Sequence, residues 1–393
     1  MEQRSDLSFY PSVIELSKPA LKSNLQFLRQ RAGKEATISS VIKGNAYGHG
    51  IEPFLPLAEE CGVRHFAVFS ADEAVKAVRA KCRPETHIMI MGDIVDEALE
   101  WAIENDISFY IFETGRLKKA TEAAERVGRK ARVHLQLETG MHRTGFEPEE
   151  HEEVISFINS NGNHIQVDGI CTHFAGAESV ANYVRITEQK RRFKNAVEEF
   201  REGLDREIPY IHAASSAALL GYPDTIYNMV RTGIAQYGFW PSRETYMLLK
   251  REDRRGGEDP LSRVLRWSSH VMSVKQVDEG EFVGYGNIYL TNRASRIATV
   301  PIGYSHGFGR NLTNTGFVLI RGERAPVAGL VNMNMLTVDV TDIPGVERGD
   351  EVVLIGRQGD REITLASFGE LSNNLNYEVL VRLPMDTPRK VVL

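Results

Sequence analysis

A lysine followed by a glycine-rich loop stands at the end of an apolar run near the N-terminus. The run at 38–42 has the character of a buried β-strand, and Lys43 ends it before the residues GNAYGHG. A lysine removed from water has a lowered pKa and, once neutral, can attack a carbonyl carbon. The residues around it leave a second interpretation equally open, in which the side chain only extends from the strand end into solvent.

The elements that position this lysine alternate between two types of pattern. Helical patterns separate short β-type runs at 37–42, 66–69, 88–91, 109–112, 133–137, 165–170, 210–211 and 233–239. About eight such units in 240 residues predict parallel strands joined by crossover helices, the size of one (β/α)8 barrel. An open doubly wound sheet competes, but no G-x-G-x-x-G motif follows the first strand. In a barrel the carboxyl ends of the strands form the active-site face, so Lys43 would lie there.

The sequence changes character after residue 241. Residues 251–260 form a polar, charge-rich stretch typical of a linker or surface loop. Short Val/Ile/Thr runs follow at 296–301, 316–320, 336–340 and 351–355, and helical periodicity returns only at 365–371. The predicted fold class is therefore α/β, with a TIM-type (β/α)8 barrel over residues 10–245 and a mostly β domain over 246–393. Residues 1–9 are a segment that could pack with the second domain.

Composition excludes several classes of protein. The chain has 47 Lys and Arg against 53 Asp and Glu, a net charge of −6, which argues against binding to nucleic acid or to an anionic membrane. No apolar run approaches the roughly 18 residues of a transmembrane helix, and the N-terminal residues do not resemble a secretory signal. The three cysteines are widely spaced, so we expect buried free thiols, no zinc site and a cytoplasmic protein.

Several further segments carry unusual residue combinations and together resemble one known family. They read VIKGNAYGHG (41–50), LETGMHRTGF (137–146), CTHFAGAE (171–178), HAASSAA (212–218), VRTGIAQYG (230–238), VGYGNIY (283–289), PIGYSHGFGR (301–310), VAGLVNMNM (327–335), RGDEVVLIG (348–356) and NYEVL (376–380). In this order they resemble the alanine racemase family, whose members hold pyridoxal 5'-phosphate as a Schiff base on the lysine matching Lys43. The resemblance implies a cytoplasmic isomerase that interconverts L- and D-alanine, supplies a cell-wall precursor and works as a homodimer with shared sites.

The resemblance also implies a two-base mechanism. Removing the α-proton of an amino acid leaves a carbanion that the cofactor ring delocalises, and racemisation returns the proton on the other face. Lys43 matches the base on one face and Tyr285 the base on the other. Because a free tyrosine has a pKa of about 10, it needs nearby positive charge or hydrogen bonds, and His173 and Arg231 match the family's residues there.

The remaining contacts are also carried over from the family. Arg231 matches the arginine at the pyridine nitrogen, and Arg143 matches the one at the phenolic oxygen and the substrate carboxylate. Met333 matches the residue whose backbone N–H reaches that carboxylate, and Tyr304 with Tyr285 matches a narrow entrance. The phosphate contacts match Ser216, Gly233, Ile234, Tyr47 and Tyr377. Taken singly, most of these residues have ordinary structural explanations, and only their joint pattern favours the site.

The chain departs from the family at a few positions. Gln136 stands where many members have a carbamylated lysine that braces the arginine matching Arg143, so we expect a bound anion such as chloride instead. Asn334, His306 and Asp386 alter the charge near the entrance and carboxylate regions, and Ser215 replaces an asparagine beside Ser216. These changes bear on the substrate more than on the reaction.

Other functions remain to be weighed against this one. The first is a racemase of the same fold acting on serine, lysine or arginine. The second is a non-catalytic pyridoxal-phosphate-binding protein, although such proteins usually lack the β domain and its tyrosine. A metal-dependent hydrolase fails because no His-x-His or carboxylate cluster has metal-ligand spacing. The charge-rich helix at 188–207 is interpreted as the solvated outside of the barrel.

Overall fold

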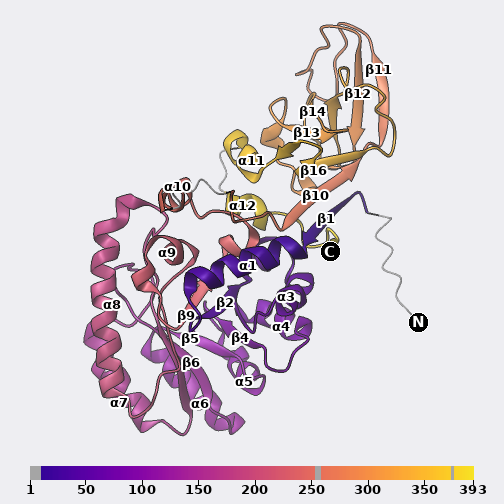
Figure 1. Ribbon diagram of the computed structural model, residues 1–393. Coiled ribbons are helices and arrows are strands. Elements are labelled where there is room, and N and C mark those ends of the chain that lie inside the picture. The colour runs from indigo at the N-terminus through magenta and orange to yellow at the C-terminus, as the bar shows by residue number, and fades with distance from the viewer. Residues whose placement is uncertain (1–9, 253–257, 373–375) are drawn as a thin grey trace. The chain divides into compact units, whose positions relative to one another are not determined.

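Eight parallel strands, surrounded by helices, form one unit of the computed structural model (Figure 1). The structure describes residues 10–252, 258–372 and 376–393. The strand order is β8-β7-β6-β5-β4-β3-β2-β9. Strands β2 to β8 therefore lie side by side in chain order, and β9 pairs with β2. The strands are β2 (Thr37–Val41), β3 (His65–Val68), β4 (His87–Ile90), β5 (Ser108–Ile111), β6 (Ala131–Gln136), β7 (Ile165–Cys171), β8 (Tyr210–His212) and β9 (Met229–Thr232). The expected (β/α)8 barrel is confirmed.

The two edge strands of this sheet close on each other. A parallel bridge pairs Ser215, just after β8, with Arg231 of β9. The Arg231 N–H donates to the carbonyl of Ala214 at 2.9 Å. Closure places Arg231 beside the segment that follows β8.

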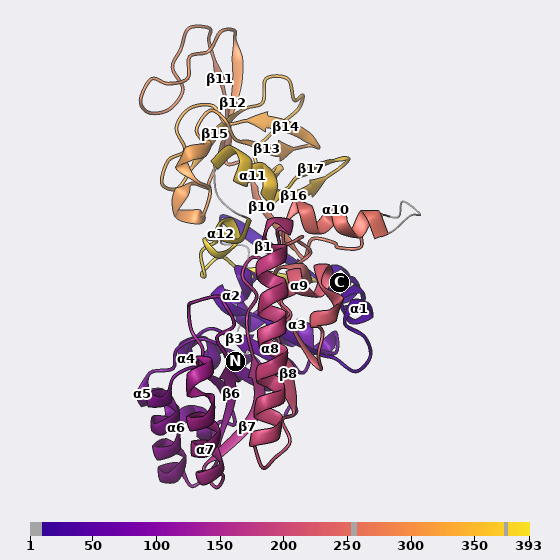
Figure 2. The ribbon, with the colours of Figure 1, turned by 90° about the vertical axis from the view of Figure 1, so that its left-hand side faces the viewer.

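The helices cover the outside of the strands, and α8 runs along one side as the longest of them (Figure 2). Their buried positions recur at helical spacing, as in α6, where Leu117, Ala120 and Ala124 face the strands. The helices are α1 (Lys18–Ala32), α3 (Ile51–Glu60), α4 (Ala71–Ala80), α5 (Asp96–Glu104), α6 (Thr114–Val127), α7 (His151–Ser160), α8 (Tyr183–Gly203), α9 (Ser216–Gly221) and α10 (Arg243–Glu252). The segment labelled α2 (Lys43–Tyr47) is a left-handed turn after β2. Within the described residues, no helix is both long and apolar enough to cross a membrane.

The eighth strand lies earlier in the chain than expected. The prediction of a strand at 233–239 is wrong, because β9 ends at Thr232 and Ile234–Tyr237 is a single 3-10 turn, η5. The N–H groups of Gly233 and Ala235 donate to the hydroxyl of Ser216, at 2.9 and 3.4 Å, instead of to a neighbouring strand. The hydrogen bond between Gly233 and Ser216, which lie 17 residues apart in the chain, therefore ends the strand.

The second unit is built on two sheets. The larger has the order β14-β13-β16-β10-β1-β18 with β17 paired to β16, and the smaller has the order β11-β12-β15. The strands are β1 (Ser12–Ser17), β10 (Leu265–His270), β11 (Ser273–Val277), β12 (Ser295–Val300), β13 (Phe317–Ile320), β14 (Glu323–Pro326), β15 (Leu336–Asp339), β16 (Glu351–Gln358), β17 (Arg361–Ile363) and β18 (Arg389–Val392), with α11 (Leu365–Ser372) and α12 (Asn376–Val381). The expected mostly β domain is confirmed.

The two units divide the chain at different places from those expected. Strand β1 pairs antiparallel with β10 and parallel with β18, so residues 10–18 group with the β unit and not with the barrel. Residues 47–53 also group with the β unit, and 246–252 and 258–262 group with the barrel. The expectation that residues 1–9 could pack with the β domain lies outside the described residues.

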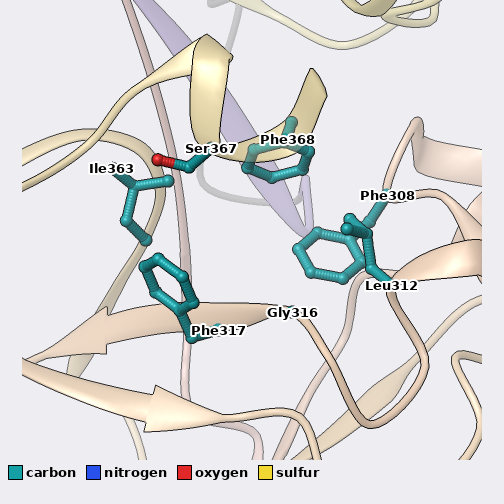
Figure 3. A pocket seen from close by; sticks show the side chains of 7 residues that line it. All are labelled: Phe308, Leu312, Gly316, Phe317, Ile363, Ser367 and Phe368. Carbon is teal, nitrogen blue, oxygen red and sulfur yellow. The ribbon is translucent and has the colours of Figure 1, made fainter. Parts of the chain in front are cut away.

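A small apolar pocket lies within the β unit (Figure 3). The residues that line it are Phe308, Leu312, Gly316, Phe317, Ile363, Ser367 and Phe368. None of these seven carries an ionisable side chain, so the pocket offers no acid or base for catalysis. The expected burial of the cysteines holds for Cys61 and Cys171 but is wrong for Cys82, which is exposed.

Candidate active site

The barrel residues singled out by the sequence follow the carboxyl ends of their strands. In a parallel barrel these ends share one face, so the side chains converge although they are far apart in the chain. The residues are Lys43 after β2, Arg143 after β6, His173 after β7, Ser216 after β8, Arg231 within β9, and Gly233 and Ile234 after it.

Lys43 combines an accessible side chain with a perturbed amine. Burial by the surrounding protein lowers the pKa of its amine, and the guanidinium groups of Arg143 and Arg231 lower it further. The carboxylate of Glu73 acts in the opposite direction. The side chain is nevertheless exposed, so a small carbonyl compound can reach it. A lysine in this state supplies more neutral amine near pH 7 than an ordinary surface lysine does.

The turn after Lys43 has a rare backbone conformation. Gly44, Asn45 and Ala46 have φ/ψ angles of 61/44°, 54/50° and 53/48°, and Tyr47 has a φ of 50°. This is the left-handed region, which costs roughly 1–2 kcal/mol for each residue with a Cβ and is seldom adopted in succession. Contacts elsewhere in the fold must therefore hold this turn.

Arg231 is buried, and both of its terminal nitrogens donate hydrogen bonds within the barrel. Its side chain is 6% exposed. Nη1 donates to Nδ1 and to the carbonyl of His212, at 2.6 and 2.8 Å, and Nη2 donates to the carbonyls of Thr172 and Ala213, at 2.7 and 3.1 Å. These bonds fix the plane of the guanidinium within the barrel.

His173 lies among these cations as a neutral ring. Burial, followed by the charges of Arg231, Arg143 and Lys43, lowers the pKa of its imidazole to about 3. Its carbonyl accepts a hydrogen bond of 3.2 Å from Nε2 of Gln189. At neutral pH the ring is therefore able to accept or donate a hydrogen bond without adding charge.

The loop that carries Arg143 folds around a carboxylate. Glu138 accepts hydrogen bonds from the backbone N–H groups of the four residues 140–143. Burial raises the pKa of Glu138, but these four bonds outweigh it and hold the pKa below its usual range. Arg143 itself is exposed. The buried Gln136 donates from Nε2 to the carbonyl of Thr144 at 3.2 Å.

Two residues that hydrogen-bond the loops of the barrel site were not predicted from the sequence. Glu138 lies inside the motif LETGMHRTGF but was not assigned a role. Gln189 lies on α8, interpreted as solvated, yet it is 1% exposed. It accepts from the N–H of Ala175 at 2.9 Å and donates to Oγ1 of Thr139 at 3.3 Å. A polar residue on the apolar stripe of α8 was the available signal.

Backbone and hydroxyl groups after β8 and β9 offer donors for an anion. Ser216 is buried, and its oxygen accepts from the N–H groups of Gly233 and Ala235, which leaves its own proton to be donated to a ligand. In the β unit, the rings of Tyr47 and Tyr377 lie 6.0 Å apart. Burial, and then Tyr377, raises the pKa of Tyr47, so its hydroxyl remains a proton donor.

The other predicted residues lie on the β unit. The side chains of Tyr285, Tyr304 and Met333 are 73%, 41% and 55% exposed. Tyr285 stands between two glycines with left-handed φ angles, Gly284 and Gly286. The carbonyl of Met333 accepts from Ser305, and the amide of Asn334 donates to the Ser305 hydroxyl at 3.1 Å. Neither unit by itself brings these side chains together with Lys43.

Family models match both units of the chain. The model for the N-terminal domain of alanine racemase matches residues 16–241, and the model for its C-terminal domain matches 264–391. The chain belongs to the alanine racemase family. The alanine racemase of Leptospira interrogans is 33% identical over 390 residues, which cover 98% of this chain and 96% of that protein.

Solved alanine racemases have the same fold. A structure of the alanine racemase of Clostridium difficile 630 has a TM-score of 0.87 at 31% identity, covering 98% of this chain and 96% of that one. The structure of alanine racemase from Bacillus anthracis with bound L-Ala-P has a TM-score of 0.86 at 29% identity, covering 98% and 96%. The expected alanine racemase family and its two-domain fold are therefore confirmed.

Proposed function

We propose that this protein is a pyridoxal-phosphate-dependent alanine racemase, an isomerase that interconverts L- and D-alanine. The observation that carries the proposal is the state of Lys43, whose accessible amine has a lowered pKa and lies at a strand end among Arg143, His173 and Arg231. Membership of the alanine racemase family over nearly the whole chain supports the same activity.

The groups present fit this cofactor. An amine with a lowered pKa suits the cofactor's aldehyde. The Ser216 hydroxyl, whose oxygen accepts from the Gly233 N–H and whose own proton can be donated, suits its phosphate together with the N–H of Ile234. The residues proposed to hold the cofactor are Lys43, Tyr47, Arg143, His173, Ser216, Arg231, Gly233, Ile234 and Tyr377. When bound, pyridoxal phosphate spreads the negative charge that remains after an α-proton is removed from an amino acid.

Lys43 and Tyr285 are the two proposed bases. Lys43 holds or returns the proton on one face of the α-carbon, and Tyr285 does so on the other. The exposure of Tyr285 on the β unit agrees with a homodimer in which each chain completes the other's site. Met333 and Tyr304, which are also exposed on the β unit, are proposed to enter the partner's site together with Tyr285.

The arginines have distinct proposed roles. Arg143, on its exposed loop, pairs with the substrate carboxylate and with the phenolic oxygen of the cofactor. Arg231 contacts the pyridine nitrogen. Because a guanidinium keeps its proton, Arg231 donates a hydrogen bond there without transferring a proton. A bound anion such as chloride beside Gln136 supplies the negative charge that the neutral amide lacks.

The substrate is proposed to be a small amino acid, with alanine preferred. Asn334 and His306 keep serine, lysine and arginine as alternatives, because both residues are neutral near the entrance region. Burial lowers the pKa of His306 although Asp386 raises it, so this ring is uncharged at neutral pH. A cytoplasmic location and a supply of D-alanine for cell-wall precursors complete the proposal.

Chiral chromatography of separate L-amino-acid incubations tests the activity. The purified chain with added cofactor should form D-alanine faster than D-serine, D-lysine or D-arginine, and Lys43→Ala protein should form none. Faster formation of another D-amino acid would change the substrate but keep the reaction. No D-product from any substrate would leave a cofactor-binding protein without racemase activity.

A further inference from the structure

The left-handed turn after Lys43 is bound by the side chain of Glu73, which comes from another element. Glu73 lies in the first turn of α4, 29 residues from Gly44. Its Oε1 accepts hydrogen bonds from the N–H groups of Gly44 and Asn45, at 2.6 and 3.2 Å. Two successive N–H groups that converge on one oxygen form the anion-binding arrangement that left-handed residues make available.

The second carboxylate oxygen of Glu73 is also used. Oε2 accepts from the N–H of Phe69 at 2.9 Å, just after β3. Strands β2 and β3 are parallel neighbours, with Val41 opposite Ala67. Glu73 therefore joins the loops at the ends of two adjacent strands, and one of these loops begins with Lys43.

Local contacts alone do not account for this turn. The N–H of Ala46 donates to the carbonyl of Ile42 at 2.7 Å, which closes the turn on itself. The N–H groups of Gly44 and Asn45 point instead to Glu73, and Asn45 and Ala46 remain in a conformation that side chains with a Cβ avoid. Removing the carboxylate takes this acceptor away from both N–H groups.

The negative charge of Glu73 also affects the pKa of the Lys43 amine. Four groups act on or with Lys43: Arg143 from the loop after β6, His173 from the segment after β7, Arg231 from β9, and Glu73 from α4. The two arginines lower the pKa of Lys43, and Glu73 raises it. A neutral residue at position 73 would therefore lower the pKa of Lys43 further.

We propose that Glu73 is the positioning residue for Lys43: its carboxylate holds the left-handed turn and supplies the negative charge that faces the lysine. Glu73 acts through Lys43 and the backbone and is not itself a base in the reaction. The inference rests on the proposed function, in which Lys43 holds the cofactor. Its test, however, needs neither cofactor nor turnover.

The charge is tested by the ionisation of Lys43 in the full-length chain after removal of cofactor. Trace labelling with acetic anhydride at a series of pH values, followed by mass spectrometry of the Lys43 peptide, gives the midpoint at which the amine becomes reactive. Glu73→Gln should lower this midpoint by about one pH unit. The matched control is Asp72→Asn, which removes an exposed carboxylate one residue away on the same helix and should leave the midpoint unchanged. Equal midpoints in the two variants would overturn the electrostatic part.

The position is tested by hydrogen exchange of the full-length chain, in the same cofactor-free form. In Glu73→Ala the amides of residues 44 and 45 should exchange at least about tenfold faster than in the parent, while peptides from β5 and β6 stay protected. The control is Asp72→Ala. Unchanged exchange at 44 and 45 would show that the turn does not depend on Glu73. If Glu73→Ala does not fold, the labelling midpoint of Glu73→Gln still decides the inference. If the chain proves not to bind pyridoxal phosphate, only the proposed function fails.

Discussion

Arg231 fixes the tautomer of His212. The guanidinium donates to Nδ1 of His212 at 2.6 Å and has no acceptor atom, so Nδ1 is unprotonated and the ring proton is at Nε2. Nε2 lies 2.9 Å from Nδ1 of His134, which must accept this proton's hydrogen bond. The direction of hydrogen bonding through the barrel interior is therefore set by one cation beside the site.

This relationship predicts a spectroscopic result. Burial, and then the charge of Arg231, lowers the pKa of His212 well below its usual range, and burial does the same for His134. Both rings should remain neutral with the proton at Nε2 from pH 6 to 8, as ¹⁵N NMR of histidine-labelled protein can report. In Arg231→Met, His212 should become a mixture of tautomers. A proton on Nδ1 of His212 in the unmutated chain would contradict the hydrogen-bond direction.

Lys43→Ala should abolish racemisation. The proposed reaction uses the amine both to hold the cofactor and as a base, so the rate should fall by about 10³-fold or more. The visible absorbance of cofactor bound to the protein should change at the same time. The matched control is Lys76→Ala on α4. Normal turnover of the Lys43 variant would end the proposal.

Tyr285→Phe tests the second base. Proton exchange with solvent should stop from one face of alanine and continue from the other, measured by deuterium incorporation into each enantiomer. Cofactor should remain bound, because Lys43 is untouched. Wild-type exchange on both faces would refute the assignment of two bases.

Mixed chains test whether sites are shared between subunits. Lys43→Ala and Tyr285→Phe chains are each expected to be inactive alone. After random exchange in equal amounts, half of the dimers contain one intact site, so about a quarter of the wild-type activity should return. No recovery after verified exchange would exclude a shared site.

Glu138 should make the Arg143 loop sensitive to acid. Its pKa is held below the usual range by four backbone N–H groups, so its contribution to folding is present above the unfolded pKa of about 4.3 and is lost as the pH falls through the folded pKa. Glu138→Gln should lower the free energy of unfolding at pH 7 by about 1–3 kcal/mol. The difference between variant and parent, measured by urea denaturation, should shrink below about pH 4.

Two results would contradict this account of Glu138. A difference that grows at low pH would have the wrong sign. An equal loss in Glu149→Gln, which changes an exposed glutamate nearby, would show a general effect of charge.

Gln136 should make substrate binding depend on a small anion. Replacing chloride by gluconate at constant ionic strength should raise KM for alanine about fivefold, as expected for an ion pair worth on the order of 1 kcal/mol. Gln136→Glu supplies its own charge and should lose this dependence. A KM that is independent of chloride would exclude the anion.

The sequence by itself determined the class of fold and the family, and it pointed to the groups proposed to react. Strand and helix periodicity is a property of neighbouring residues, so seven of the eight barrel strands could be predicted from it, as could the β-rich character after residue 264. The motifs around Lys43, Arg143 and Arg231 could likewise be recognised, because each is a short continuous segment.

Only the tertiary structure decided what holds these groups in place. Strand β1 joins the β unit because it pairs with residues some 250 positions away, and β9 ends where Ser216 captures two N–H groups. Glu73 and Gln189 likewise act on loops from other elements. A hydrogen bond between distant segments forms only where closure of the barrel brings them together. Local residue patterns do not determine which segments these are.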